Sequence, residues 1–75
     1  MTTSVETGHV TGTADKDYDL IWYTERCLNN VLRLETFIAD AERSRDNELA
    51  ELFRKAQADN KKGAEIGKQM MRSRL

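Results

Sequence analysis

Apolar and small side chains recur along residues 20–41 at alternating intervals of four and three. The seven positions are Leu20, Thr24, Cys27, Val31, Leu34, Ile38 and Ala41. This is the heptad repeat that keeps one stripe of an α-helix turned toward a partner helix. The pattern predicts a long helix with one continuous packing face, which we call the seam.

The predicted first helix spans about residues 16–43. Three aspartates between residues 15 and 19 suit the positive end of a helix dipole, and Thr13 or Asp15 can cap the helix. Beside the seam, Ile21, Leu28 and Leu32 make the apolar face wider than a two-helix contact requires. We therefore expect a second partner to cover this side of the helix.

The heptad pattern ends at residues 42–47, which read ERSRDN. Ser44 or Asp46 can cap a new helix, and Glu48 falls in its acidic first turn. Because the interruption is short, the second helix, about residues 47–72, must fold back beside the first as an αα-hairpin. The predicted fold class is therefore all-α, with an antiparallel helical hairpin over residues 15–75.

The second helix carries a weaker amphipathic pattern. Its predicted seam is Leu49, Phe53, Ala56, Asn60, Gly63, Gly67 and Met70. A glycine in a helix interior costs about 1 kcal/mol relative to alanine. Two interpretations stay open: the two helices approach each other closely at the glycines, or the last turns of the second helix fray.

Residues 1–14 are rich in threonine and glycine and contain few aliphatic side chains. Such a segment cannot offset its own ordering entropy by burial, so we expect a disordered N-terminal arm.

A chain of 75 residues, one-third of them charged and with few aromatic side chains, has a marginal core on its own. Self-association would bury the remaining apolar stripe, and two hairpins would make a four-helix bundle. We therefore predict a homodimer or a larger assembly. The residues expected to carry it are Leu20, Ile21, Leu28, Val31, Leu34, Ile38, Leu49, Phe53 and Met70.

Charge and composition narrow the function classes. The formal net charge is −1, with five basic and eleven acidic side chains in residues 1–53 and seven and two in residues 54–75. A nucleic-acid binder using the basic end is only a third candidate, because that end lacks interleaved aromatic residues. No apolar run approaches the roughly 20 residues of a membrane span. The absence of a signal-peptide pattern and the single cysteine fit a cytoplasmic protein.

The candidate chemistry is sparse. Glu35 lies at the edge of the seam, and Glu42 lies one heptad later. If Glu35 were buried, it would need a basic partner such as Arg54 or Lys61. A degenerate ferritin-like protein that binds metal through inter-chain carboxylates is the alternative function. Cys27 is expected to be a small core residue because no histidine lies near it in the sequence. We predict no enzyme activity, no cofactor and no metal.

Trp22 lies opposite the seam, with Tyr18 one turn before it. An outward tryptophan either marks a contact with a protein partner, since aromatic residues dominate interface hot spots, or packs on the N-terminal arm of its own chain or on Arg26. Both interpretations stay open.

The segment DAERSRDNELAELFR, residues 40–54, resembles the helix–turn–helix of small bacterial ferritin-like or rubrerythrin-like hairpin proteins. The longer run that contains this segment, residues 27–54, covers about a third of the chain. It implies an antiparallel hairpin that assembles into a bundle. Two features depart from the family: the Glu-x-x-His ligands are missing, and Arg45 stands where such turns often have glycine.

Overall fold

Two long helices dominate the computed structural model, which describes residues 7–75. Helix α1 spans Gly8–Thr11, α2 spans Asp15–Arg43 and α3 spans Asn47–Arg74. All regular elements within residues 7–75 are helical. The observed bounds of α2 and α3 differ by two residues at most from the ranges expected from the sequence.

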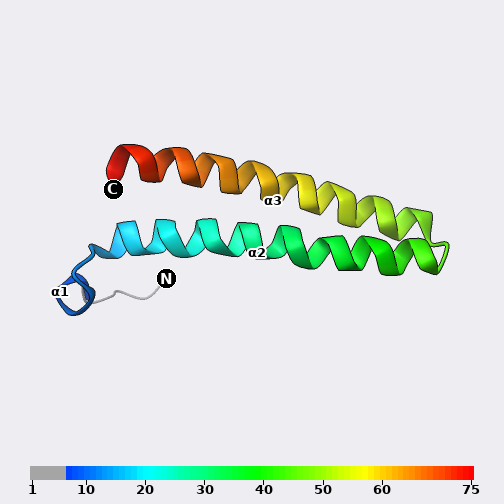
Figure 1. Ribbon diagram of the computed structural model, residues 1–75, viewed down its shortest axis with the longest axis horizontal. Coiled ribbons are helices and arrows are strands. Elements are labelled where there is room, and N and C mark those ends of the chain that lie inside the picture. Colours follow the sequence, from blue (N-terminus) through cyan, green and yellow to red (C-terminus); the bar gives the residue numbers. More distant parts are fainter. Residues whose placement is uncertain (1–6) are drawn as a thin grey trace.

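The helices α2 and α3 run antiparallel and lie side by side as a hairpin (Figure 1). The turn between them closes one end, while the start of α2 and the end of α3 lie at the other end. The all-α hairpin predicted from the heptad pattern is therefore confirmed.

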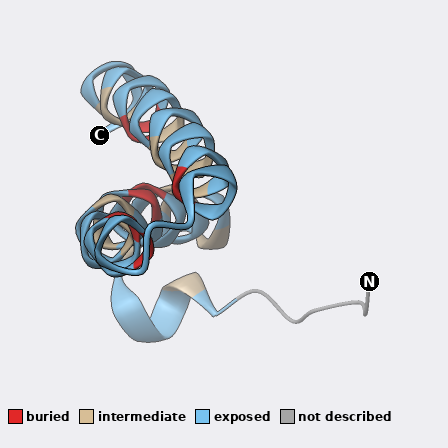
Figure 2. Ribbon diagram, turned by 90° about the vertical axis from the view of Figure 1, so that its right-hand side faces the viewer, coloured by how far each residue is buried: buried red, intermediate tan, exposed pale blue. Residues whose placement is uncertain are grey.

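The seam predicted on α2 is the face that packs against α3. Thr24, Cys27, Ile38 and Ala41 are buried, and Leu20, Val31 and Leu34 are half-buried. Figure 2 shows buried stretches, in red, where the two long helices lie against each other. The regular alternation of four and three residues suffices here because every seam position is apolar or small.

The seam predicted on α3 is wrong at its two ends, Leu49 and Met70, and is buried or half-buried at the five positions between them. The buried and half-buried positions of α3 are Ala50, Phe53, Ala56, Gln57, Asn60, Gly63, Ala64, Gly67, Lys68 and Met71. Leu49 and Met70 lie outside this seam, with 38% and 43% of their surface exposed, whereas Ala50 is fully buried. At the two ends of α3 the sequence prediction chose Leu49 and Met70 for their size, but the helix turns Ala50 and Ala64 inward, where small side chains allow closer approach.

The N-terminal cap of α2 also differs from the prediction. The residue at the cap position is Ala14, and its side chain makes no capping hydrogen bond. The carboxylate of Asp15 instead accepts hydrogen bonds from the backbone N–H of Thr7 and from its hydroxyl. Of the N-terminal arm, residues 1–6 lie outside the described residues, and residues 8–11 form the single turn of α1.

The turn between α2 and α3 contains one motif that ends α2 and one that begins α3. The N–H of Arg45 donates to the carbonyl of Glu42, and the N–H of Asp46 donates to the carbonyl of Ala41. This is the Schellman arrangement, which places the residue after the C-cap in the left-handed region. Arg45 occupies that place with φ 58°. Asp46 then caps α3, since its carboxylate accepts from the N–H of Leu49 at 3.1 Å.

Replacing Arg45 with glycine is expected to stabilise the hairpin. The left-handed conformation costs a non-glycine residue roughly 1–2 kcal/mol. Part of that gain is lost because glycine increases the entropy of the unfolded chain. The net increase in the free energy of unfolding should be about 0.5–1 kcal/mol, measured by urea denaturation followed by circular dichroism. Arg45→Ala is the control, and an equal stabilisation by alanine would contradict the strain argument.

Candidate interaction surfaces

The closest approach of the two helices lies at the glycines of α3. A Cβ atom added at Gly67 would lie 2.1 Å from the Thr24 hydroxyl oxygen, and one at Gly63 would lie 2.6 Å from the Tyr23 hydroxyl. The helix continues through both glycines to Arg74. Of the two interpretations left open by the sequence, close approach is therefore the one that the structure shows.

Cys27 lies in this close contact as a buried free thiol, 5% exposed. The hydrogen bond between Cys27 and the Tyr23 phenol raises the pKa of Tyr23, with smaller contributions from their charge interaction and from desolvation. The Cys27 sulfur would lie 3.0 Å from a Cβ at Gly63, so the thiol faces the partner helix. This location matches the expected small core residue.

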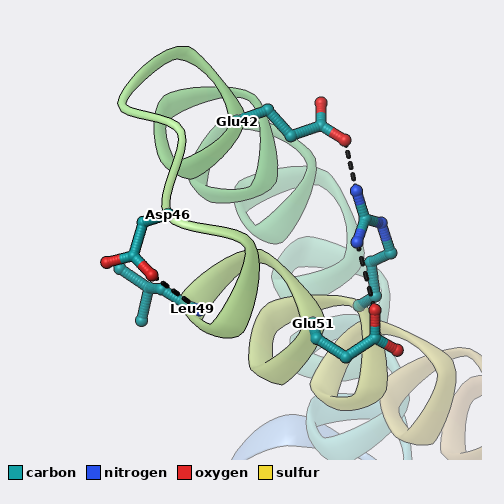
Figure 3. A network of polar contacts seen from close by, with 5 residues as sticks. Glu42, Asp46, Leu49 and Glu51 are labelled. Atoms are coloured by element: carbon teal, nitrogen blue, oxygen red, sulfur yellow. Dashed lines mark hydrogen bonds and ion pairs between the residues drawn. The ribbon is translucent and has the colours of Figure 1, made fainter.

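Polar contacts cross between the helices along one side of the hairpin. Arg54 pairs with Glu42 of α2 and, at 3.2 Å, with Glu51 of its own helix (Figure 3). Gln57 donates to the Glu35 carboxylate at 2.8 Å and to the Val31 carbonyl at 3.0 Å. The partner expected for Glu35 was Arg54 or Lys61, but a neutral amide takes that place. Glu35 is exposed, so no buried charge requires an ion pair.

An apolar row lies on this same side of α2. Ile21, Leu28, Glu35 and Glu42 follow one another at intervals of seven, and this spacing keeps them on one side of a helix. We define the α2 outer row as the exposed apolar residues of this side. They are Tyr18, Ile21, Leu28 and Leu32, with exposed fractions of 52%, 41%, 44% and 73%.

A second row lies on the other face of the hairpin. We define the α3 outer row as Leu49, Leu52, Ala56, Asp59, Gly63, Ile66 and Met70, which again alternate at three and four residues. Ala56 and Gly63 are half-buried and form the inner edge of the row, where it borders α2, and the other five residues are exposed. Figure 3 shows Leu49 on the opposite side of the turn from Glu42 and Glu51. Since Glu42 marks the side of the α2 outer row, the two rows lie on opposite faces.

Two adjoining hollows lie at the turn end of the α3 outer row. The first has a volume of about 410 Å³, and its apolar lining includes Phe37, Leu49 and Phe53. The rings of Phe37 and Phe53 pack at a centroid distance of 5.4 Å. The second hollow, also about 410 Å³, lies between Leu49 and Leu52. Asp46 lines both hollows, and Asp40 lines the first.

The residues predicted to carry assembly fall into two groups in the structure. One group packs within the hairpin, and the other is exposed on its outer rows. The first group is Leu20, Val31, Leu34, Ile38 and Phe53; the second is Ile21, Leu28, Leu49 and Met70. Sequence reasoning did not place Leu52 and Ile66 in the predicted interface, although both are exposed and their spacing puts them in the α3 outer row.

The two aromatic residues predicted for a partner contact remain accessible. Tyr18 and Trp22 are 52% and 54% exposed. The guanidinium of Arg26 lies 5.2 Å from the centroid of the Trp22 ring, so the cation–π packing weighed above is present. Contact with a protein partner stays a prediction.

The described part of the chain assembles neither a cluster of metal ligands nor a membrane-spanning helix. Within residues 7–75, no three His, Cys, Asp or Glu side chains come together in a group that could hold a metal ion. None of the helices in that range is both long enough and apolar enough to cross a membrane.

Comparison with known proteins identifies no relative of the chain. No family model, no curated protein and no solved structure matches the chain. The two outer rows are therefore the features from which a function can be argued.

Proposed function

We propose that this chain is a self-assembling helical hairpin that acts as a structural or protein-interaction module. The assembly is a homodimer or a larger bundle, as the composition of the chain suggested. One observation carries the proposal: apart from Ile38, the buried side chains of the hairpin are small, while several large apolar ones are exposed. The buried residues are Thr24, Cys27, Ile38, Ala41, Ala50, Ala64 and Gly67, whereas Leu28, Leu32, Leu52 and Ile66 are each at least 44% exposed.

This inversion has an energetic consequence. Burial stabilises in proportion to the apolar area removed from water, and alanine and glycine contribute little of it. A chain of this size needs a large buried area relative to its length, or an added device such as oligomerisation. Association through the outer rows would supply that area and would cover the exposed apolar side chains.

The proposed role includes a place for a partner protein. The α2 outer row offers apolar and aromatic surface on the face that carries Arg54, and Trp22 is exposed on the side of α2 opposite the seam. Aromatic residues of this kind are common anchors in protein interfaces. The hairpin would then link its own copies through one face and a partner through the other.

The proposal predicts that mass and stability depend on protein concentration. Sedimentation equilibrium from micromolar to millimolar protein should give a mass that is a multiple of the 8.6 kDa chain. A second copy that binds the folded chain stabilises it by mass action. The melting temperature should therefore rise with protein concentration. A well-ordered monomer with a concentration-independent melting temperature would overturn the proposal.

The alternative ferritin-like metal protein is tested on the same preparation. Elemental analysis of protein purified without chelator should find no stoichiometric iron or manganese. A stoichiometric metal would replace the structural role with a metal-binding one.

A further inference from the structure

The α3 outer row reads almost the same in both directions. Large apolar residues occupy its two ends, small residues follow inward, and Asp59 stands at the centre. The matching pairs are Leu49 with Met70, Leu52 with Ile66, and Ala56 with Gly63. A two-fold interface pairs each residue with its counterpart in the reverse direction, so a row with this symmetry complements itself.

We propose that the α3 outer row is the contact between two copies of the chain, with the two α3 helices antiparallel and crossing near Asp59. The inference rests on the proposed self-assembly and specifies its face, partner and direction. Near the crossing the row carries little bulk, because Ala56 is small and the Cβ position of Gly63 faces Tyr23 and Cys27 of its own α2. Leu49 and Leu52 of one copy then face Met70 and Ile66 of the second copy.

The hollows at the turn end fit this arrangement. The two-fold axis brings Met70 of the second copy opposite Leu49, at the hollow lined by Phe37 and Phe53. A methionine is flexible enough to fill an irregular apolar hollow, and its thioether makes favourable contacts with aromatic rings. The reciprocal contact at the other end of the row fills the hollow of the second copy.

Charges at the ends of the row are also complementary. Asp46 lies three residues before Leu49, and Arg74 lies four residues after Met70. The same symmetry places Arg74 of the second copy near Asp46. Asp46 already accepts from the N–H of Leu49, and a carboxylate has the lone pairs to accept further hydrogen bonds. The ends of the interface are therefore attractive. Like charges meet only near its centre, where Asp59 faces its own counterpart and Lys55 lies near Lys62 of the second copy on the flank of the row.

The α2 outer row lacks this self-complementarity. Its side of α2 is apolar from Tyr18 to Leu32 and acidic at Glu35 and Glu42. An antiparallel copy would set apolar residues against carboxylates. On the same face, α3 presents Arg54, Lys61 and Lys68 at intervals of seven, so a symmetric contact would also bring cations together. A second copy therefore fits the α3 outer row better.

Charge substitutions in the two rows test which face holds the dimer. Leu52→Lys should weaken the dimer, raising its dissociation constant at least about 30-fold, because each dimer then buries two unpaired ammonium groups. Leu32→Lys in the α2 outer row is the matched control and should leave the dissociation constant within about threefold. Leu52 is 59% exposed and Leu32 73%, so neither substitution disturbs the hairpin core. Sedimentation equilibrium measures both constants.

Cysteine cross-linking tests the direction of the helices. Asp59→Cys places a thiol beside the two-fold axis, where both Cα atoms can come within the roughly 4.4–6.8 Å that a disulfide spans. Mild oxidation should link Asp59→Cys into a covalent dimer. Lys61→Cys, on the other side of α3, should stay unlinked, and the buried Cys27 is common to both variants.

The outcomes separate this inference from the proposed function. A wild-type dimer that Leu52→Lys does not weaken, or that does not link through Asp59→Cys, overturns the antiparallel α3 contact but leaves self-assembly standing. A wild-type chain that is monomeric at every concentration overturns both. Loss of the dimer in Leu52→Lys together with linkage through Asp59→Cys supports both.

Discussion

Replacing Leu34 with aspartate is expected to unfold the hairpin and to abolish its self-assembly. Leu34 packs in the seam between α2 and α3 and is half-buried. The substitution removes its apolar contacts and places an unpaired carboxylate between the helices. Losing a core leucine alone costs about 2–5 kcal/mol, and an unsatisfied polar group adds to that cost. Such a loss is comparable to the whole stability of a domain this small.

Circular dichroism at 25 °C and the sedimentation mass should both report this loss. Leu32→Asp is the matched control, because Leu32 is only two residues away and 73% exposed. The control should retain its helical signal. If Leu34→Asp keeps both its helicity and its mass, the seam between α2 and α3 does not hold the molecule together.

Replacing Gly67 with alanine is expected to destabilise the hairpin by about 2 kcal/mol, within the range for overpacked sites. Alanine would normally gain about 1 kcal/mol over glycine in a helix. Here its Cβ would overlap the Thr24 hydroxyl, which is held by a 2.8 Å hydrogen bond to the carbonyl of Leu20. Relief requires Thr24 to give up that bond or the helices to separate.

Urea denaturation should give a lower unfolding midpoint for Gly67→Ala than for the unsubstituted chain. Adding Thr24→Ala to Gly67→Ala should restore most of the lost stability. Gly63→Ala is the contrasting variant. Its closest neighbour is the hydroxyl of Tyr23, the end of a long and half-exposed side chain that can swing aside. It should be neutral or more stable by up to about 1 kcal/mol. Equal effects of the two alanines would show that close approach at Thr24 does not limit the packing.

The α2 side of the hairpin could be predicted because its sequence pattern and its packing coincide. Every seam position from Leu20 to Ala41 is small or apolar, so periodicity alone finds the buried face. Asp46 was also predictable as a cap, since its position before Glu48 and the next apolar repeat is a local signal. These features depend on residues that are near each other in the sequence.

The α3 side could not be predicted in the same way. Leu49 and Ala50 both fit a heptad, and the choice between them depends on how closely the two helices approach. That distance is set by the contacts of Thr24 and Cys27 with Gly67 and Gly63, about 40 residues away in the sequence. Burial of apolar area favours a seam with Leu49 facing α2, whereas the close approach of the two helices favours one with Ala50 there. The close approach determines which residue is buried, so Ala50 faces α2 and Leu49 is exposed in the α3 outer row.

The surroundings of Glu35 illustrate a second limit. Its partner Gln57 is polar but uncharged, so charge patterning alone favoured Arg54 or Lys61. Arg54 instead reaches toward the turn to Glu42 and Glu51. Exposed pairs of this kind are typically worth less than about 1 kcal/mol, so packing of the seam decides their geometry.

The buried position of Cys27 makes the thiol a sensor of fluctuations in the folded chain. A soluble thiol reagent can reach the sulfur only when α2 and α3 move apart, so the labelling rate scales with the fraction of time that this contact is broken. Since Gly63 covers the sulfur near the middle of α3, brief fraying at the tips would leave the reaction slow. The chain therefore carries a built-in probe of the separation of its two helices, which needs no added dye or engineered residue.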